Sequence, residues 1–247
     1  MPKEMTPEEM VSRLLYRDGL MLVIDKPAGL AVHNGPKGGV CLQSYFDALR
    51  FGLPREPGLA HRLDRDTSGC LVLGRHRKAL AELGKLFRNG AVGKTYWAVV
   101  EGTPEADEGR IDLPLGRLDD KIGWWMKHDP EGQPSATNWK VLGRSSLAAL
   151  TWLALEPLTG RTHQIRVHCA EMGWPVLGDA IYGNAPRTGG PVLHLHARDV
   201  TVPLYKNREP IRVTAAPPEH MRERLAACGW TGEEITPPGE AMAQNNQ

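Results

Sequence analysis

The chain has 247 residues, of which 41% are hydrophobic and 24% are charged, a balance typical of a globular protein that buries a sizeable core. Its formal net charge is only +1, so the overall charge does not indicate a nucleic-acid partner. No uncharged apolar run approaches the ~18 residues of a transmembrane helix. Residues 1–16 also lack the long apolar stretch of a signal peptide, so we expect a cytoplasmic protein that does not cross a membrane.

Strand patterns dominate the chain. The first is the apolar run Leu20–Asp25, which stops before Pro27. A second run, Cys70–Gly74, follows the turn residues Thr67-Ser68-Gly69, and Gly102–Glu108 is typical of a loop between strands. Five further segments have the composition of strands: residues 96–100, 122–126, 137–142, 148–155 and 193–202.

Helical spacing of apolar residues occurs in three places, over 42–49, 79–87 and 165–172. Thr159 or Thr162 could cap the start of the third helix, and Gly173 could end it. A fourth, short helical pattern follows Pro217-Pro218.

A series of strands with few helices predicts an α+β fold, because the helices are too few for a regular βαβ alternation. We therefore expect a mixed, largely antiparallel sheet with a few flanking helices. Residues 1–247 are expected to form a single domain with its core at about 18–216. Residues 217–247 should form a short helix and a polar, acidic tail.

The small net charge conceals an uneven distribution. Residues 50–94 contain ten basic and four acidic residues, a net charge of +6, whereas residues 217–247 contain two basic and five acidic residues, a net charge of −3. The basic segment could be a solvated helix face or a set of phosphate contacts, and composition alone does not decide between them.

The segment His61-Arg62-Leu63-Asp64-Arg65-Asp66-Thr67-Ser68-Gly69 is the most unusual in the chain. A carboxylate flanked by arginines has a lowered pKa and stays ionised, which suits a nucleophile or an electrostatic stabiliser better than a general acid. If the segment is extended, Arg62, Asp64 and Asp66 face the same side. Composition alone favours the other interpretation, an ion-pair network on a surface loop.

Two further segments have the residues of a binding or catalytic site. Residues 159–168 place polar side chains at a helix start, where Arg166 could pair bidentately with a carboxylate or a phosphate; the alternative is an amphipathic helix with exposed basic residues. Tyr96, on a strand face with Ala98 and Val100, could be a core tyrosine or a stacking platform for a base.

Signals for a metal or a cofactor are weak. His194 and His196 share one strand face, but no C-x-x-C, H-E-x-x-H or acidic cluster completes a ligand set. The four cysteines are scattered and predict neither a disulfide framework nor a zinc ribbon. No G-x-G-x-x-G or G-K-[ST] element occurs, so we expect no nucleotide cofactor and no metal.

Taken together, these segments resemble the RluA-type pseudouridine synthase family, because seven of its motifs occur in the family's order between about Leu20 and Pro203. Asn34 and Cys70 depart from the usual pattern without touching the presumed chemistry. Residues 1–18 are too short for the S4-like RNA-binding domain of many relatives. The motifs lie at Asp25–His33, His61–Gly69, Lys94–Tyr96, Leu113–Arg117 with Ala136-Thr137, Thr159–His168, Gly178–Gly183 and Leu195–Ala197.

The resemblance implies an enzyme that isomerises uridine to pseudouridine within rRNA or tRNA, in a central RNA-binding catalytic cleft and without a cofactor. By position in the motifs, Asp64 is the catalytic aspartate, Arg166 is the arginine that pairs with it, and Tyr96 lies against the target base. Arg62 is a candidate wedge that fills the place of the flipped base. The remaining candidate RNA-binding residues are His61, Arg65, Lys94, Arg161 and His163. We expect a monomer.

Two alternatives stay open at this point. A non-catalytic RNA-binding or chaperone-like module of the same fold would bind RNA without modifying it. A hydrolase with Asp64 and Asp66 as an acid/base pair is disfavoured, because the adjacent arginines would keep both carboxylates ionised and leave no proton donor. If Arg166 neutralises a buried Asp64, then Arg166→Ala should also destabilise the fold.

Overall fold

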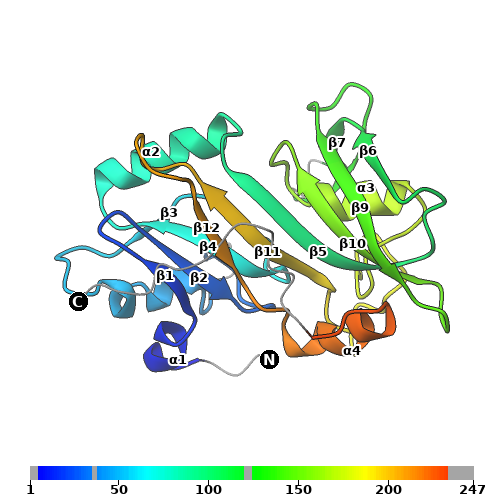
Figure 1. Ribbon diagram of the computed structural model, residues 1–247, viewed down its shortest axis with the longest axis horizontal. Coiled ribbons are helices and arrows are strands. Elements are labelled where there is room, and N and C mark those ends of the chain that lie inside the picture. The colour runs from blue at the N-terminus through cyan, green and yellow to red at the C-terminus, as the bar shows by residue number, and fades with distance from the viewer. Residues whose placement is uncertain (1–4, 35–37, 120–123, 233–247) are drawn as a thin grey trace.

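The structure, a computed structural model, describes residues 5–34, 38–119 and 124–232 (Figure 1). Its main feature is a ten-stranded sheet. The strands of this sheet are β1 (Leu14–Arg17), β2 (Met21–Lys26), β3 (Gly58–Leu59), β4 (Ser68–Gly74), β5 (Gly93–Glu101), β6 (Glu108–Asp112), β9 (Ala136–Arg144), β10 (Leu150–Pro157), β11 (Leu195–Val202) and β12 (Ile211–Thr214). Their order is β1-β2-β4-β11-β5-β10-β9-β6, with β12 beside β11 and β3 beside β4.

A small second sheet pairs β7 (Leu115–Arg117) with β8 (Met126–His128). The helices are α1 (Pro7–Val11), α2 (Arg77–Arg88), α3 (Gln164–Glu171) and α4 (Glu219–Ala227), with the 3₁₀ turns η1 (Leu42–Tyr45) and η2 (Asp47–Leu49). Among the described strands, only β4 and β11 pair in parallel; every other named pair is antiparallel. The α+β class with a mixed, largely antiparallel sheet is therefore confirmed.

Both faces of the sheet are covered where β2 and β4 pair. Leu22 and Leu71 are fully buried in one apolar cluster, together with the side chains of η1 and η2. Val23 and Val72 belong to a second cluster on the other face, where Leu83 of α2 packs against them. Because successive strand residues point to opposite faces, this double covering explains why the runs are continuously apolar instead of alternating.

The β5–β10 pair follows the same rule. Ala98 and Leu153 pack with α3 on one face, and Trp97 and Trp152 pack with α4 on the other. Tyr96 contacts both clusters on the α3 face. That junction between two apolar clusters is where polar residues gather.

Most of the longer predicted elements are confirmed. The strands expected near residues 20–25, 70–74, 96–100, 137–142, 148–155 and 193–202 correspond to β2, β4, β5, β9, β10 and β11, and the expected helices near 79–87 and 165–172 and after Pro218 are α2, α3 and α4. Gly173 ends α3 with a φ of +82°, a left-handed conformation that glycine adopts without a steric penalty.

Four predictions about local structure were wrong. Residues 42–49 form two 3₁₀ turns, because their amides bond to carbonyls three residues earlier, as Phe46 N does to Gln43 O and Leu49 N to Phe46 O (both 3.1 Å). Ser68 and Gly69 belong to β4 and not to a turn. The strand expected over 122–126 begins only at Met126 as β8, and residues 122 and 123 lie outside the described ranges.

The fourth concerns the start of α3, whose N-cap is His163 and neither Thr159 nor Thr162. Thr159 instead donates its hydroxyl to Gln164 Oε1 (2.6 Å). The acidic residues of the tail after Gly232 lie outside the described residues.

Within the described ranges, no helix combines the length and apolar character that a bilayer crossing requires.

Candidate active site

A cleft of about 540 Å³ opens beside the junction of the two apolar clusters. Its walls come from the loop before β4, from the end of α2, from β5, from the segment 157–166 that leads into α3, and from Leu195 at the start of β11. Of the nine residues predicted for the site, all except Arg65 line this cleft. The eight that do are His61, Arg62, Asp64, Lys94, Tyr96, Arg161, His163 and Arg166. The folded chain thus brings together three segments that are far apart in sequence.

Arg65 and Asp66 do not line the cleft. Arg65 Nε pairs with Asp66 Oδ1 at 2.9 Å, and the arginine is largely exposed. The extended alternation expected over residues 62–66 is broken by a turn, in which Thr67 N donates to Asp64 O at 3.3 Å. Asp64 therefore turns into the cleft, whereas Asp66 serves as an ion-pair partner.

The loop that contains Asp64 and Arg65 is anchored by Lys26, which is fully buried at the end of β2. Lys26 Nζ donates to the carbonyl oxygens of Pro27 (2.8 Å), Leu30 (2.8 Å) and Arg65 (2.9 Å). The Gly29 amide donates to the same Arg65 carbonyl at 2.9 Å. Burial lowers the pKa of Lys26 to about 7, while the Asp66, Asp64 and Asp25 carboxylates act in the opposite direction. Three acceptors match the three donors of an ammonium group, so the ion ties the 26–30 turn to the loop.

The Asp64 carboxylate itself is only loosely held. Its side chain is 22% exposed, and Oδ2 lies 3.9 Å from His163 Nε2 and 4.0 Å from Arg166 Nη1. Both distances are too long for hydrogen bonds. No residue in the described ranges donates a hydrogen bond to this carboxylate, so its lone pairs are open toward the cleft.

The principal partner of Arg166 is Asp179, which the sequence did not indicate. Arg166 Nε donates to Asp179 Oδ2 at 2.7 Å and Nη2 donates to Oδ1 at 2.8 Å, with the two side chains 5% and 0% exposed. The bidentate geometry expected of Arg166 is present, but its partner is Asp179. Asp64 lies near only the third guanidinium nitrogen, Nη1, at 4.0 Å. The expectation that Arg166 stabilises the fold by neutralising a buried Asp64 must be corrected accordingly, because the buried carboxylate is that of Asp179.

Asp179 is further held by the amides of Ile181 (2.9 Å) and Tyr182 (3.0 Å). Burial opposes its ionisation, yet the hydrogen bonds from Arg166 and from these amides lower its pKa. The turn 178–183 is thereby fixed to α3, and it places Tyr182 Oη 2.8 Å from His163 Nδ1.

His163 has an unusual backbone, with a φ of +52° that residues with a Cβ seldom adopt. The segment before it is held by Gln164, whose Oε1 accepts from Arg161 N (3.0 Å) and whose Nε2 donates to the Ala136 carbonyl (2.9 Å). His163 Nδ1 then meets Tyr182 Oη at 2.8 Å. The other ring nitrogen, Nε2, and Arg166 Nη1 are both about 4 Å from the same oxygen, Asp64 Oδ2.

His61 serves the fold of the cleft wall. Its ring stacks on Phe87 with centroids 4.3 Å apart, and its Nε2 accepts from Val72 N at 3.0 Å. Burial lowers the pKa of His61 to about 3, so it stays neutral near pH 7. One ring nitrogen is thus already engaged by the backbone.

Tyr96 and Lys94 extend along β5 into the cleft. Burial, and then the nearby Asp64 carboxylate, raise the pKa of Tyr96, so its phenol is protonated. Burial lowers the pKa of Lys94, and the described residues give its ammonium no hydrogen bond or ion pair. Lys94 is therefore available to an anion that enters the cleft.

Arg62 bridges the cleft wall to the α3 segment. Its Nη2 donates to Thr162 Oγ1 at 2.6 Å, across 100 residues of sequence. Both the Arg62 and Arg161 side chains are exposed, and Arg161 Nε donates to the Pro134 carbonyl at 3.2 Å. These guanidinium groups add positive charge to the rim.

Within the described residues, no group of three or more His, Cys, Asp or Glu side chains is arranged to hold a metal ion. Of the two histidines expected on one strand face, only His196 lies in β11, and it contacts Ser68 Oγ (2.9 Å) and the Ala215 carbonyl oxygen (3.0 Å).

Three residues of the site had no role in the sequence-based prediction: Lys26, Asp179 and Tyr182. Each lies in a motif that carries the family resemblance, at Asp25–His33 and Gly178–Gly183. For Lys26 and Asp179 the available signal was a charged residue among small and apolar ones, because such a residue is buried only when it has partners.

Comparison with known proteins places this geometry in context. The sequence model described as RNA pseudouridylate synthase matches residues 20–171. An uncharacterized RNA pseudouridine synthase from Zymomonas mobilis is 41% identical over 212 residues, which cover 85% of this chain and 95% of that protein. The ribosomal large subunit pseudouridine synthase C of Vibrio cholerae is 34% identical, over 88% of this chain and 69% of that protein.

A solved structure shows the same architecture. That of human RNA pseudouridylate synthase domain containing 4 superposes with a TM-score of 0.74 at 27% identity, and the match covers 90% of this chain and 95% of that chain.

Proposed function

The chain belongs to the RNA pseudouridylate synthase family, whose members are isomerases that act on RNA, and from this premise we propose that Asp64 is its catalytic aspartate. The observation that carries the proposal is the convergence of Asp64, Tyr96 and Arg166 on one cleft. In the proposed reaction the N1–C1′ bond of a uridine breaks, the uracil turns, and a C5–C1′ bond forms. C5 loses its proton and N1 gains one, so atoms balance without a cofactor.

Asp64 is suited to attack or to electrostatic assistance. Its carboxylate is partly exposed, is bordered by Arg166, and accepts no hydrogen bond from the described residues. An ionised carboxylate with free lone pairs is a competent nucleophile or base. Arg166 keeps positive charge beside it while Asp179 fixes the guanidinium in place.

Tyr96 supplies a protonated phenol ring to the wall of the cleft. A target base inside a helix must leave its stack to reach this ring, and an aromatic ring compensates part of the lost stacking. We assign Tyr96 to contact with the target base.

The rim supplies the contacts with the RNA backbone. Arg62, Lys94 and Arg161 line the cleft, and guanidinium and ammonium groups bind phosphates with little regard for sequence. The Vibrio relative is named for the large ribosomal subunit, so rRNA is the first class of substrate to test and tRNA the second.

The test uses RNA transcribed with tritium at uridine C5, because C5 loses its hydrogen when it bonds to C1′. Wild-type protein should release tritium, and Asp64→Asn should release none while binding RNA as tightly. Asp66→Asn is the matched control, since Asp66 lies outside the cleft, and it should remain active. RNA binding without release by the wild type would favour the non-catalytic module, and loss of activity only in Asp66→Asn would overturn the assignment of Asp64.

A further inference from the structure

The feature that the reaction scheme leaves unused is the chain of contacts from β8 through Tyr182 and His163 to Asp64. Met126 N donates to Tyr182 Oη at 2.9 Å, and Tyr182 Oη lies 2.8 Å from His163 Nδ1. His163 Nε2 lies 3.9 Å from Asp64 Oδ2. The imidazole thus connects a rigid turn to the proposed catalytic carboxylate.

The contacts of Tyr182 determine which ring nitrogen of His163 carries the proton. The phenol oxygen already accepts from Met126, so its own proton is best placed on His163 Nδ1. In the opposite arrangement His163 Nδ1–H would donate, and the phenol proton would find no acceptor among the described residues. An unmet donor of this kind is costly when half-buried. The neutral imidazole is therefore protonated at Nε2, the nitrogen that faces Asp64 (Nδ1 as acceptor).

The imidazole is also largely buried and packed against a second ring. Its side chain is 10% exposed, and its ring lies edge-on to that of Tyr182 with centroids 5.6 Å apart. Burial lowers the pKa of His163, although the Asp64 carboxylate opposes that change. A neutral donor can orient a carboxylate without cancelling its charge, unlike a second cation beside Arg166.

From this geometry we propose that His163 is a positioning residue for Asp64, held in its Nε2–H tautomer by Tyr182. A shift of about 1 Å would bring Nε2 within hydrogen-bond distance of Oδ2, and such contacts commonly tighten only when substrate is bound. Oδ2 would then be fixed, and Oδ1 would be left for the substrate. The proposal rests on the proposed function for its kinetic consequence, but the tautomer is a property of the protein alone.

Nitrogen-15 NMR of the imidazoles tests the tautomer without any reaction. His163, identified by the signal lost in His163→Asn, should show a protonated Nε2 and an unprotonated Nδ1 near pH 7. Tyr182→Phe should change that pattern. A protonated Nδ1 in the wild-type protein would overturn the proposal whatever the enzyme does.

Kinetics test the positioning role. Asn tolerates the left-handed backbone of residue 163, so His163→Asn should fold and should lower the single-turnover rate on the order of 10²-fold, with the Kd for RNA changed by less than about twofold. Tyr182→Phe should lower the rate in the same direction, and it should add nothing in the His163→Asn background, because Tyr182 acts through His163.

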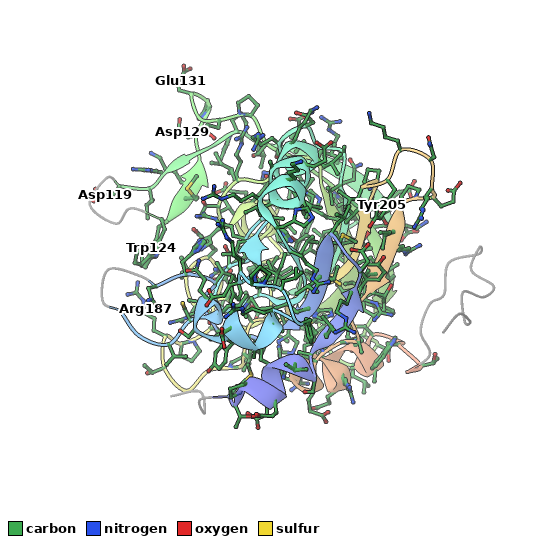
Figure 2. All side chains as sticks on the ribbon, turned by 90° about the vertical axis from the view of Figure 1, so that its left-hand side faces the viewer. Asp119, Trp124, Asp129, Glu131, Arg187 and Tyr205 are labelled. Carbon is green, nitrogen blue, oxygen red and sulfur yellow. The ribbon has the colours of Figure 1, made fainter. Side chains whose placement is uncertain are left out.

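Two variants serve as matched controls. His220→Asn and Tyr205→Phe remove the same groups elsewhere, at the start of α4 and beside Asp18, and both should keep the wild-type rate. Figure 2 shows Tyr205 on the opposite side of the view from Trp124 and Arg187.

A raised Kd with an unchanged rate would make His163 an RNA contact and overturn the proposal, as would additive effects of the two substitutions. If His163→Asn does not fold, Tyr182→Phe decides alone: a slower rate at constant Kd supports the proposal and an unchanged rate refutes it. A wild-type protein without tritium release would refute the proposed function, and the NMR result would still stand on its own.

Discussion

Replacing Arg166 by Ala tests the most consequential pairing in the site. The substitution leaves the Asp179 carboxylate in a place where its side chain is fully buried. Removing one partner of a buried ion pair typically costs about 3–5 kcal/mol of unfolding free energy. In a chain of this length each kcal/mol shifts Tm by about 2–4 °C, so we expect Tm to fall by about 6–20 °C.

The comparison variant is Asp64→Asn, which distinguishes the contribution of Asp64 to stability from that of Asp179, the other carboxylate near Arg166. Asp64 is 22% exposed and makes no hydrogen bond with Arg166, so its loss should change the unfolding free energy by less than about 1 kcal/mol. The expected pattern is therefore two inactive variants, of which only Arg166→Ala is unstable.

The pH dependence of this difference follows from the lowered pKa of Asp179. The stabilisation from its ionised form is present above the pKa of an unfolded Asp, about 3.9, and is lost as the pH falls through the lower folded pKa. In Arg166→Ala the unpaired carboxyl should instead take up a proton readily. The gap in stability between wild type and variant should hold at pH 7 and narrow toward pH 4 and below.

Thermal denaturation gives Tm, and urea denaturation at several pH values gives the unfolding free energy, both monitored by circular dichroism. A melting temperature of Arg166→Ala equal to that of the wild type would refute the reasoning. So would an Asp64→Asn protein that is equally destabilised, since Asp64 would then be the buried partner.

Gly69→Ala should lower the unfolding free energy measured in urea by ~3–5 kcal/mol, because a Cβ there would lie 2.3 Å from the Ala197 carbonyl oxygen at a φ of +103°. Gly173 has a similarly positive φ but open space around it, so Gly173→Ala should cost only about 1–2 kcal/mol. Equal costs for the two variants would contradict the close approach at Gly69. Lys26→Met should lower the unfolding free energy by about 3 kcal/mol, since three carbonyl oxygens lose a charged donor. Its rate of tritium release should fall more than its affinity for RNA. A variant with normal stability and rate would show that Lys26 does not anchor the loop. The Kd for RNA, measured by filter binding, should rise by at least about tenfold between 50 and 200 mM salt if several phosphates are neutralised. A Kd that does not change with salt would show that the basic residues of the rim do not bind phosphates.

The fold was largely predictable because its strands have continuous apolar runs. β2 and β4 are buried on both faces, so their composition is distinctive without any tertiary information. Short polar strands such as β6, with four exposed residues of five, carry no comparable signal, and their pairing with β9 determines their structure.

The site was predictable at the level of its motifs but not of its contacts. Asp64, Tyr96 and Arg166 come together as expected, since each follows a strong local pattern. The choice of Asp179 over Asp64 as the partner of Arg166 depends on a turn thirteen residues away, and Arg65 leaves the cleft because of one turn at 64–67. Hydrogen bonds between such segments are set by the packed fold, and a linear pattern contains no information about them.

The place of β11 in the sheet has a consequence for how the protein is made. β11 lies between β4 and β5 (Figure 1), and its His196 meets Ser68 across 128 residues of sequence. On a ribosome that releases the chain from its N-terminus, the Asp64 loop and Tyr96 therefore emerge long before the strand that joins them. The walls of the cleft cannot assemble until β11, which ends at Val202, has emerged and paired with β4 and β5. Strand pairings between residues so far apart in sequence form slowly. A chain that has emerged only as far as α3 would hold every residue of the proposed centre and still be unable to bring them together, so catalytic competence would be gained only after β11 has emerged.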